Sequence, residues 1–267
     1  MARTLKLTLE YDGRGFRGWQ AQGAGERTVQ GVLTDALARL TGEAVAVHGA
    51  GRTDAGVHAL GQVASVVLER STLAVEALRD GLNAHLPDDV AIVRAEAAPE
   101  GFHARTWAVA KVYRYLVHAR PARSPLLAGY AWHRTGVLDI GSMREGAAAL
   151  VGRHDFSAFR ASAGQARTPV RTLARLTVEP DPAAAGLLRV EADGDGFLMH
   201  MVRIIVGTLV EVGRGKLPAG RVREILAGRD RRAAGPTAPA QGLYLVEVRY
   251  PARAPAVPEA AEDETEG

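Results

Sequence analysis

The sequence contains no cysteine among its 267 residues. This absence excludes disulfide bonds, thiolate nucleophiles and cysteine-ligated metal sites. No apolar run approaches the roughly 20 residues that a membrane-spanning helix needs. The opening residues, MARTLKLTLEYDG, alternate apolar and polar side chains, which is typical of a strand and not of a signal peptide. We therefore expect a cytoplasmic protein with no membrane association.

Lysine is also scarce, since only Lys6, Lys111 and Lys216 contribute to the 33 basic residues. The formal net charge is +3, and residues 251–267 contribute −4 through one arginine and five acids, which leaves +7 on the remainder. A basic body predicts an anionic partner such as nucleic acid. Arginine suits that partner because it contacts phosphate with two N–H groups and stacks on bases. An arginine-rich genome or a heat-adapted host explains the arginine bias equally well.

The first part of the chain alternates between strand-like and helix-like hydrophobic patterns. Residues 5–11 alternate strictly, as in a strand with one buried face. After Thr28, which fits an N-cap, apolar residues recur with helical spacing until Gly42. Further strands are predicted at 43–48, 63–68 and 90–95, and a second helix at 73–86. The predicted order is therefore β-α-β-β-α-β.

The second part of the chain repeats this order, with one small extra helix at 221–226. It has predicted strands at 112–117, 173–178, 187–190 and 243–250, and helices at 140–151, 199–212 and 221–226. Two successive β-α-β-β-α-β units predict an α+β fold of two ferredoxin-like halves. We expect their antiparallel sheets to join into one large sheet with a central cleft that binds RNA. The predicted halves are residues 1–104 and 105–250, followed by a disordered acidic tail at 251–267.

The segment GAGRTDAGVHALGQV, at residues 49–63, combines four glycines with a short charged core. It is not a phosphate-binding loop, because that motif needs lysine and Ser/Thr directly after its second glycine, and here Gly56 is followed by Val57 and His58. It is not a calcium loop either, because Asp54 is the only carboxylate between Glu43 and Glu69. The histidines of the chain show no paired metal-ligand spacing. We therefore expect no bound metal.

Two interpretations of this segment remain. In one, it is a surface loop in which Arg52 and Asp54 form an exposed ion pair of little energetic value. In the other, the glycines allow a sharp turn or a close approach by a ligand. A carboxylate beside an arginine stays ionised, and in a cleft it can act as a nucleophile. The second interpretation makes Asp54 a candidate catalytic residue.

Arg203 and Tyr113 stand out for their surroundings in the sequence. Arg203 lies inside MHMVRIIVGTLVEVG, the most apolar helical segment, where an unpaired charge is costly and an anionic partner is expected. A structural partner is one possibility and Asp54 is the other. In KVYRYLVH, Tyr113 lies on one face of a predicted strand, where it either packs in the core or offers a stacking surface to RNA bases.

With these residues placed, the chain closely resembles the bacterial tRNA pseudouridine synthase A family over about residues 5–250. Eight motifs occur in the expected order, which is a far more specific signal than any one of them. They are YDGRGFRGWQ (11–20), GRTDAGVHALGQV (51–63), FHAR (102–105), YRY (113–115), DFSAF (155–159), RTPVR (167–171), FLMHMVRIIVGTLVEVG (197–213) and GLYLV (242–246). One departure is Ile204, where the family usually has asparagine.

The resemblance implies an enzyme that isomerises uridine in tRNA to pseudouridine. The bond between the base nitrogen and the sugar breaks, the base turns, and a carbon–carbon bond replaces it. The family acts on uridines on the 3′ side of the anticodon stem-loop and uses no metal, redox step or nucleotide cofactor. Its members are homodimers in which each tRNA touches both subunits.

The resemblance also implies roles for particular residues. Asp54 matches the catalytic aspartate, which attacks either the sugar carbon, as a glycosidase nucleophile does, or the ring of the base. Arg203 matches the arginine that pairs with and orients that aspartate. Tyr113 matches the tyrosine that stacks on the extruded base. Arg52 matches an arginine that holds the place of the base in the stem, and Leu245 would line the apolar side of the pocket.

Two other functions fit parts of the sequence. A non-catalytic RNA-binding protein with ferredoxin-like halves explains the charge and the tyrosines, but gives Asp54 no role. A nucleoside or glycoside hydrolase uses Asp54, but enzymes of that kind usually need a second carboxylate. No such carboxylate lies nearby in the sequence.

Overall fold

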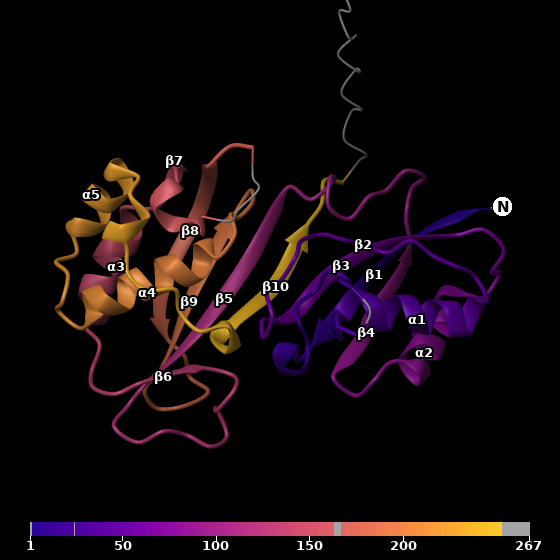
Figure 1. Ribbon diagram of the computed structural model, residues 1–267, viewed down its shortest axis with the longest axis horizontal. Helices are drawn as coiled ribbons and strands as arrows, with labels where there is room; N and C mark the ends of the chain where they lie inside the picture. The colour runs from indigo at the N-terminus through magenta and orange to yellow at the C-terminus, as the bar shows by residue number, and fades with distance from the viewer. Residues whose placement is uncertain (1, 24, 163–166, 253–267) are drawn as a thin grey trace, which may run out of the picture.

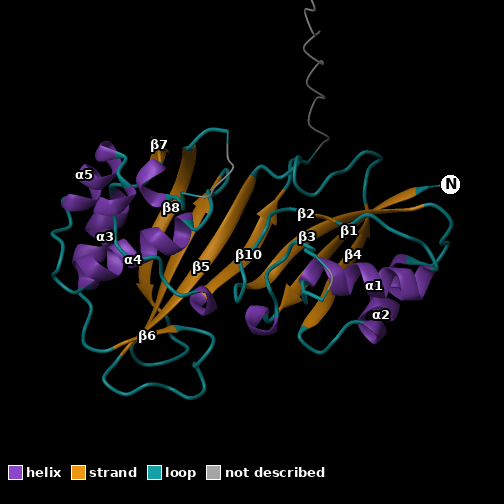
Figure 2. Ribbon diagram, in the orientation of Figure 1, coloured by secondary structure: helices purple, strands orange, loops and turns teal. Residues whose placement is uncertain are grey.

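One sheet of ten strands runs through the computed structural model, which describes residues 2–23, 25–162 and 167–252 (Figure 1). The main path of the sheet is β4-β1-β3-β10-β5-β9-β8-β7, with β2 beside β3 and β6 beside β5. Figure 2 shows helices gathered at both ends of this sheet and the strands β10 and β5 between them. Residues 253–267, most of the predicted acidic tail, lie outside the described residues. No helix in the described part of the chain is both long and apolar enough to cross a membrane.

The N-terminal half has the strand order of a ferredoxin-like unit. Its elements are β1 (Arg3–Tyr11), α1 (Val29–Thr41), β2 (His48–Gly49), β3 (His58–Leu68), α2 (Val75–His85) and β4 (Val90–Ala97). Strand β1 lies between β3 and β4 and pairs antiparallel with both. The spatial order is thus fourth, first, third and second. Alternate residues of β1, including Leu5, Leu7 and Leu9, are fully buried in the core.

The C-terminal half has the same order with additions. Its elements are β5 (Ala110–Ala119), β6 (Trp132–Arg134), α3 (Ile140–Ala148), β7 (Gly152–Asp155), β8 (Val170–Pro180), β9 (Leu187–Gly194), α4 (Met201–Gly213), α5 (Arg221–Gly228) and β10 (Leu243–Arg249). Strands β10, β5, β9 and β8 are again neighbours in the order fourth, first, third and second. Helix α4 is buried along nearly its whole length, as its apolar sequence predicts.

The two halves join where β10 pairs with β3. This pairing is parallel and short, with Tyr244 opposite His58 and Leu245 opposite Ala59. Strand β2 pairs with the far end of β3 and is only two residues long, so the rest of that edge is free for β10. The prediction of an α+β protein whose two ferredoxin-like halves form one large sheet is confirmed.

The prediction of a strand at 43–48 is wrong. Within the described residues 43–49, only His48 and Gly49 pair with β3, and residues 43–47 pair with no strand. The Glu43 carboxylate instead accepts hydrogen bonds from the backbone N–H groups of residues 69, 70 and 71 at 2.7–3.2 Å. These bonds lower the pKa of Glu43. The apolar alternation of this segment is satisfied instead by burial of Val45 and Val47 against the core.

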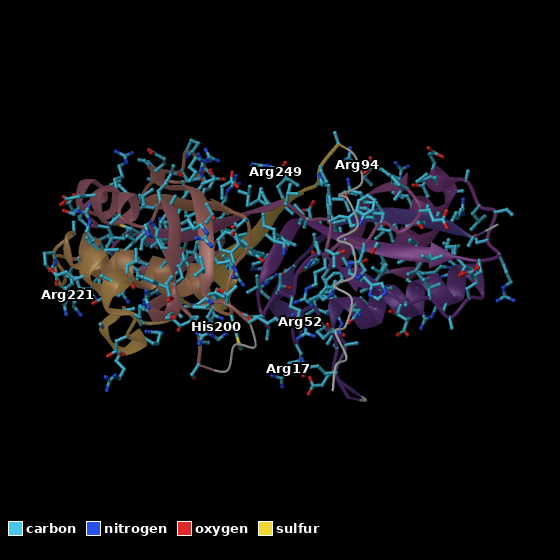
Figure 3. The ribbon with its side chains drawn as sticks, turned by 90° about the horizontal axis from the view of Figure 1, so that it is seen from above. Arg17, Arg52, Arg94, His200, Arg221 and Arg249 are labelled. Carbon is cyan, nitrogen blue, oxygen red and sulfur yellow. The ribbon has the colours of Figure 1, made fainter. Side chains whose placement is uncertain are left out.

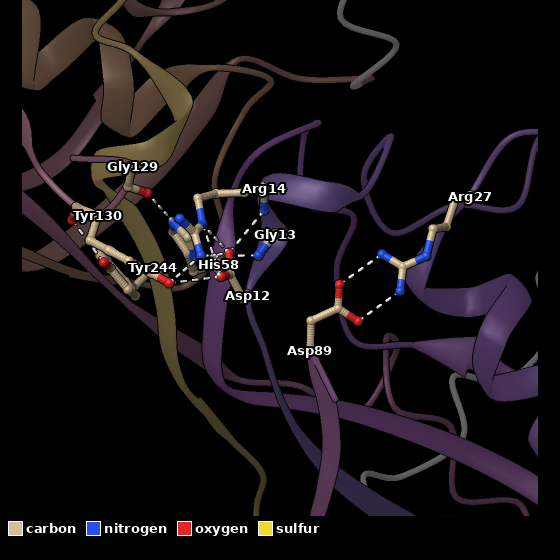
Figure 4. Close-up of polar contacts among 9 residues, drawn as sticks. All are labelled: Asp12, Gly13, Arg14, Arg27, His58, Asp89, Gly129, Tyr130 and Tyr244. Atoms are coloured by element: carbon tan, nitrogen blue, oxygen red, sulfur yellow. Dashed lines mark hydrogen bonds and ion pairs between the residues drawn. The ribbon is translucent and has the colours of Figure 1, made fainter. Parts of the chain in front are cut away.

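A polar cluster also fastens the halves together (Figure 4). The Asp12 carboxylate accepts hydrogen bonds from Arg14 and, at 2.9 Å, from the Tyr130 hydroxyl of the loop after β5. The Tyr244 hydroxyl of β10 donates to the carbonyl of Tyr130 at 2.7 Å. Burial disfavours ionisation of Asp12, but the bonds from Arg14 and Tyr130 outweigh it and hold the pKa of Asp12 at about 2. His58, stacked on Tyr244, completes the cluster.

Candidate active site

The loop that carries Asp54 lies at the junction of the two halves. It leaves β2 at Gly49 and enters β3 at His58, the residue that faces β10. The N–H of Val57 donates to the carbonyl of Asp54 at 3.1 Å, which closes a tight turn, and Gly56 has a φ of +79°. Gly56 therefore suits this turn, because other residues adopt a positive φ only at a cost in free energy.

The segment before α1 forms the base on which this loop lies. The N–H of Trp19 donates to the carbonyl of Thr53 at 3.0 Å, and the hydroxyls of Tyr11 and Thr53 are 2.8 Å apart. A Cβ on Gly18, whose φ is +96°, would lie 2.6 Å from the Thr53 carbonyl oxygen. The glycine-rich motif YDGRGFRGWQ therefore acts as a close-fitting support for the Asp54 loop.

Arg203 contacts Asp54, as the sequence predicts. Its Nη1 atom donates to Oδ2 of Asp54 at 2.9 Å, and its Nε donates to the carbonyl of Ala238 at 2.7 Å. The Arg203 side chain is 14% exposed and that of Asp54 is 31% exposed, so the pair is partly shielded from water. Charge-assisted bonds of this kind are stronger than neutral ones. The pair connects a loop of the first half to a helix of the second.

His200 is a second partner of Asp54 that the sequence analysis missed. Its Nε2 atom lies 3.3 Å from the same oxygen, Oδ2. His200 is the N-cap of α4 and has a φ of +60°, a conformation that is uncommon outside glycine. A lone histidine has no spacing signal of its own. Because His200 has a left-handed backbone and precedes the first helical residue, Met201, its contact with Asp54 does not follow from helical spacing relative to Arg203.

Tyr113 is almost fully buried beside the Asp54 loop. Its ring meets that of Phe197 edge-on, with the centroids 5.0 Å apart. Burial, together with the negative charge of Asp54, raises the pKa of Tyr113 well above its usual value. The phenol therefore stays protonated at neutral pH. Phe197 is a further site residue that the sequence analysis did not single out.

These residues surround one cavity of about 620 Å³. Its lining residues are Gly51, Arg52, Thr53, Asp54, Val57, Arg105, Lys111, Tyr113, Arg171, Phe197, Leu198, Met199, His200, Met201, Val202 and Leu243. Leu245 is fully buried in β10 and pairs with Tyr113 across the sheet, but the β10 residue that lines the cavity is Leu243. The volume is typical of small-molecule sites and is large enough for one nucleotide.

Arg52 lies at the exposed rim of this cavity, and Figure 3 shows it in the middle of the molecule together with His200. Its Nε atom donates to Oε1 of Gln20 at 3.1 Å. Asp54 bonds to Arg203 and not to Arg52. The interpretation of Arg52 and Asp54 as a surface ion pair is therefore wrong. The described residues contain no group of three or more acidic or histidine side chains that could hold a metal ion.

The fold and the site together define the pseudouridine synthase class, with its joined ferredoxin-like halves and an aspartate between them. The chain belongs to the tRNA pseudouridine synthase family, whose sequence profile matches residues 8–106 and 147–251. These ranges include Asp54 and Arg203, whereas Tyr113 lies between them.

Curated relatives match nearly the whole chain. It is 51% identical to tRNA pseudouridine synthase A of Myxococcus xanthus over 97% of this chain and 98% of that one. It is 50% identical to tRNA pseudouridine synthase A of Acidiphilium cryptum over 93% of this chain and 96% of the other. Among solved structures, a chain of an H/ACA RNP bound to a substrate RNA containing 2'-deoxyuridine matches with 13% identity and a TM-score of 0.34. That match covers 77% of this chain and 44% of the other, and it is too distant to add to the argument.

Proposed function

We propose that this protein isomerises uridine in tRNA to pseudouridine, with Asp54 as the nucleophile. The observation that carries the proposal is the placement of Asp54 in a cavity between the two halves, held by Arg203 at 2.9 Å. Asp54 is the sole carboxylate among the described residues that line this cavity. A hydrolase that uses two carboxylates is therefore less well supported.

The two oxygens of Asp54 have separate tasks in this proposal. Oδ2 contacts Arg203 and His200, whereas no described residue donates a hydrogen bond to Oδ1. Oδ1 is therefore the atom that attacks the substrate, at the sugar carbon or at the ring of the base. Arg203 orients the carboxylate and balances its charge, so that attack does not require rearrangement of the site.

The reaction conserves atoms and electrons. The C1′–N1 bond breaks, a C1′–C5 bond forms, the proton on C5 leaves and N1 takes up a proton. No oxidant, reductant or group donor is therefore required, and we propose that the enzyme works without a cofactor. As a protonated phenol, Tyr113 stacks on the base and offers its hydroxyl as a hydrogen-bond partner while the base turns.

The target uridine must leave its stack to reach Asp54, at a cost of a few kcal/mol. We propose that Arg52, exposed at the rim of the cavity, fills the gap that the base leaves. Leu245, which is paired with Tyr113 on the neighbouring strand, supports the apolar wall. We further propose that the substrate sites are on the 3′ side of the anticodon stem-loop, and that a cytoplasmic homodimer holds each tRNA between its subunits. In this proposal residues 1–104 and 105–250 are the two structural halves.

Mapping of pseudouridine in tRNA from cells that lack this protein tests the proposal. We expect pseudouridine to be lost from the 3′ side of the anticodon stem-loop and restored by a plasmid copy of the wild-type chain. The matched control is a plasmid copy with a substitution far from the cavity, Arg221→Met on α5, which should restore the modification. Unchanged pseudouridine in the deletion cells would contradict the proposal.

A further inference from the structure

Besides Arg52 at its rim, three cationic side chains line the same cavity as Asp54. Arg105 comes from the loop between β4 and β5, Lys111 from β5 and Arg171 from β8. Lys111 reaches the base of the Asp54 loop, because a Cβ on Gly51 would lie 3.2 Å from its Nζ atom. The cavity thus holds a group of positive charges contributed by three separate segments.

These positive charges have no carboxylate partner among the described residues. Arg171 donates only to the backbone carbonyls of Thr168 and Val170, at 3.0 and 2.6 Å. Arg105 and Lys111 take part in no ion pair within the described ranges, whereas the single carboxylate of the cavity is already paired with Arg203. Like charges that lie close together without an anion oppose one another.

The unfavourable surroundings of these charges affect the protonation of Lys111. Burial, together with the positive charges of Arg105 and Arg171, lowers the pKa of Lys111 to about 8. An anion that enters the cavity would restore full protonation of the lysine and pair with both guanidinium groups. Two arginines and a lysine suit phosphate in particular, because guanidinium groups bind phosphate through two parallel N–H bonds and an ammonium adds a point charge.

We propose that Arg105, Lys111 and Arg171 bind the phosphate group of the nucleotide that is isomerised. This inference rests on the proposed function, since it takes a uridine nucleotide as the substrate. The phosphate is bonded to the same sugar whose base Asp54 must reach, and one cavity of about 620 Å³ holds both sites. Binding of the phosphate therefore positions the sugar relative to Oδ1 of Asp54. Exposed Arg52 at the rim acts on the RNA stem and not on this phosphate.

Binding of small nucleotides tests the proposal. Equilibrium dialysis compares uridine with uridine 5′-monophosphate and uridine 3′-monophosphate, using wild-type protein, Lys111→Met, Lys111→Arg and Arg221→Met. The Arg221→Met variant is the control, because it also removes one positive charge but lies at the far end of the molecule on α5 (Figure 3). We expect wild type and the control to bind one monophosphate at least about tenfold more tightly than uridine.

Lys111→Met should reduce this preference to about twofold or less, and Lys111→Arg should retain it. The better of the two monophosphates identifies which phosphate the subsite holds. Failure of the wild type to bind either monophosphate more tightly than uridine would overturn the proposal, as would an unchanged preference in Lys111→Met. Pseudouridine formation by the wild type on a tRNA transcript is measured in parallel. A wild type that is active but shows no monophosphate preference would refute the subsite and leave the proposed function intact.

Discussion

At the scale of single residues, the surroundings of Asp54 explain its predicted reactivity. One carboxylate oxygen contacts Arg203 of α4 and the N-cap residue His200, and no described residue donates a hydrogen bond to the other oxygen. The charged residue in the apolar helix was enough to predict an anionic partner for Arg203, but not which one, and the resemblance to the family pointed to Asp54. His200 gave no comparable signal, because its contact depends on a left-handed backbone conformation that only the folded chain reveals.

We predict that His200, whose Nε2 atom lies 3.3 Å from Oδ2 of Asp54, donates a hydrogen bond to that oxygen during the reaction and so supports catalysis. The variants His200→Gln and His200→Met have side chains of similar length, and both place a non-glycine residue at a φ of +60°. Only glutamine retains an N–H donor. Because a hydrogen bond to a charged group contributes about 1.5–3 kcal/mol, kcat on a tRNA transcript should fall about tenfold to a hundredfold in His200→Met, with little change in KM.

His200→Gln should recover most of the lost kcat, because its amide donates in place of the imidazole. Equal loss in both variants would show that His200 acts only through packing. His200→Gly relieves the backbone conformation and removes the donor, so it separates strain from hydrogen bonding. It should be about as stable as wild type and about as inactive as His200→Met.

At the scale of elements, the Asp54 loop depends on a neighbouring segment for its shape. The backbone of residues 16–19 lies against it, and two of the four backbone hydrogen bonds made by residues 50–57 come from this segment. The motif YDGRGFRGWQ was part of the resemblance to the family, but its sequence gave no sign of what it packs against. Close backbone contact between distant segments cannot be read from local spacing.

Gly18 and Gly25 offer a matched test of this support. Both have a φ near +97°, at +96° and +98°, so alanine strains both backbones similarly. A Cβ on Gly18 would lie 2.6 Å from the Thr53 carbonyl oxygen, whereas a Cβ on Gly25 would meet nothing within 4 Å among the described residues. Gly18→Ala should therefore displace the Asp54 loop and lower turnover by at least about tenfold, since small misplacement of a catalytic group is costly.

Gly25→Ala should lose about 1–3 kcal/mol of stability, the cost of a non-glycine residue at a positive φ, and keep turnover within about twofold of wild type. Thermal unfolding and single-turnover kinetics on the same tRNA transcript give both quantities. Wild-type turnover in Gly18→Ala would show that the loop does not need this support.

Most elements could be predicted because their patterns are local. The helix predicted to start after Thr28 and end at Gly42 is confirmed, since the Thr28 hydroxyl accepts from Gly31 and Gly42 has a φ of +68°. Strand β6 was not predicted, because a segment of three residues is too short to show a period. The error at 43–48 has a different cause. There, the alternating apolar residues are buried without forming a strand ladder. The Glu43 carboxylate accepts hydrogen bonds from the backbone of residues 69–71 instead.

At the scale of the whole molecule, the site exists only because the two halves are joined. Asp54 and Arg52 come from the N-terminal half, whereas Tyr113, His200 and Arg203 come from the C-terminal half. The repeated order of elements predicted two halves. It could not predict that β10 pairs in parallel with β3, because those strands are far apart in the sequence and their contact depends on the edge that β2 leaves free. The cluster around Asp12 and Tyr130 strengthens the same junction.

We predict that Asp54, held at this junction, performs the chemical step and is not required for binding. The variant Asp54→Asn has nearly the same shape, but its amide is not a nucleophile. The most direct test measures tRNA binding and pseudouridine formation by this variant under single-turnover conditions. We predict tRNA affinity within about threefold of wild type and a rate at least about a thousandfold lower. A rate within about tenfold of wild type, at equal affinity, would contradict the account.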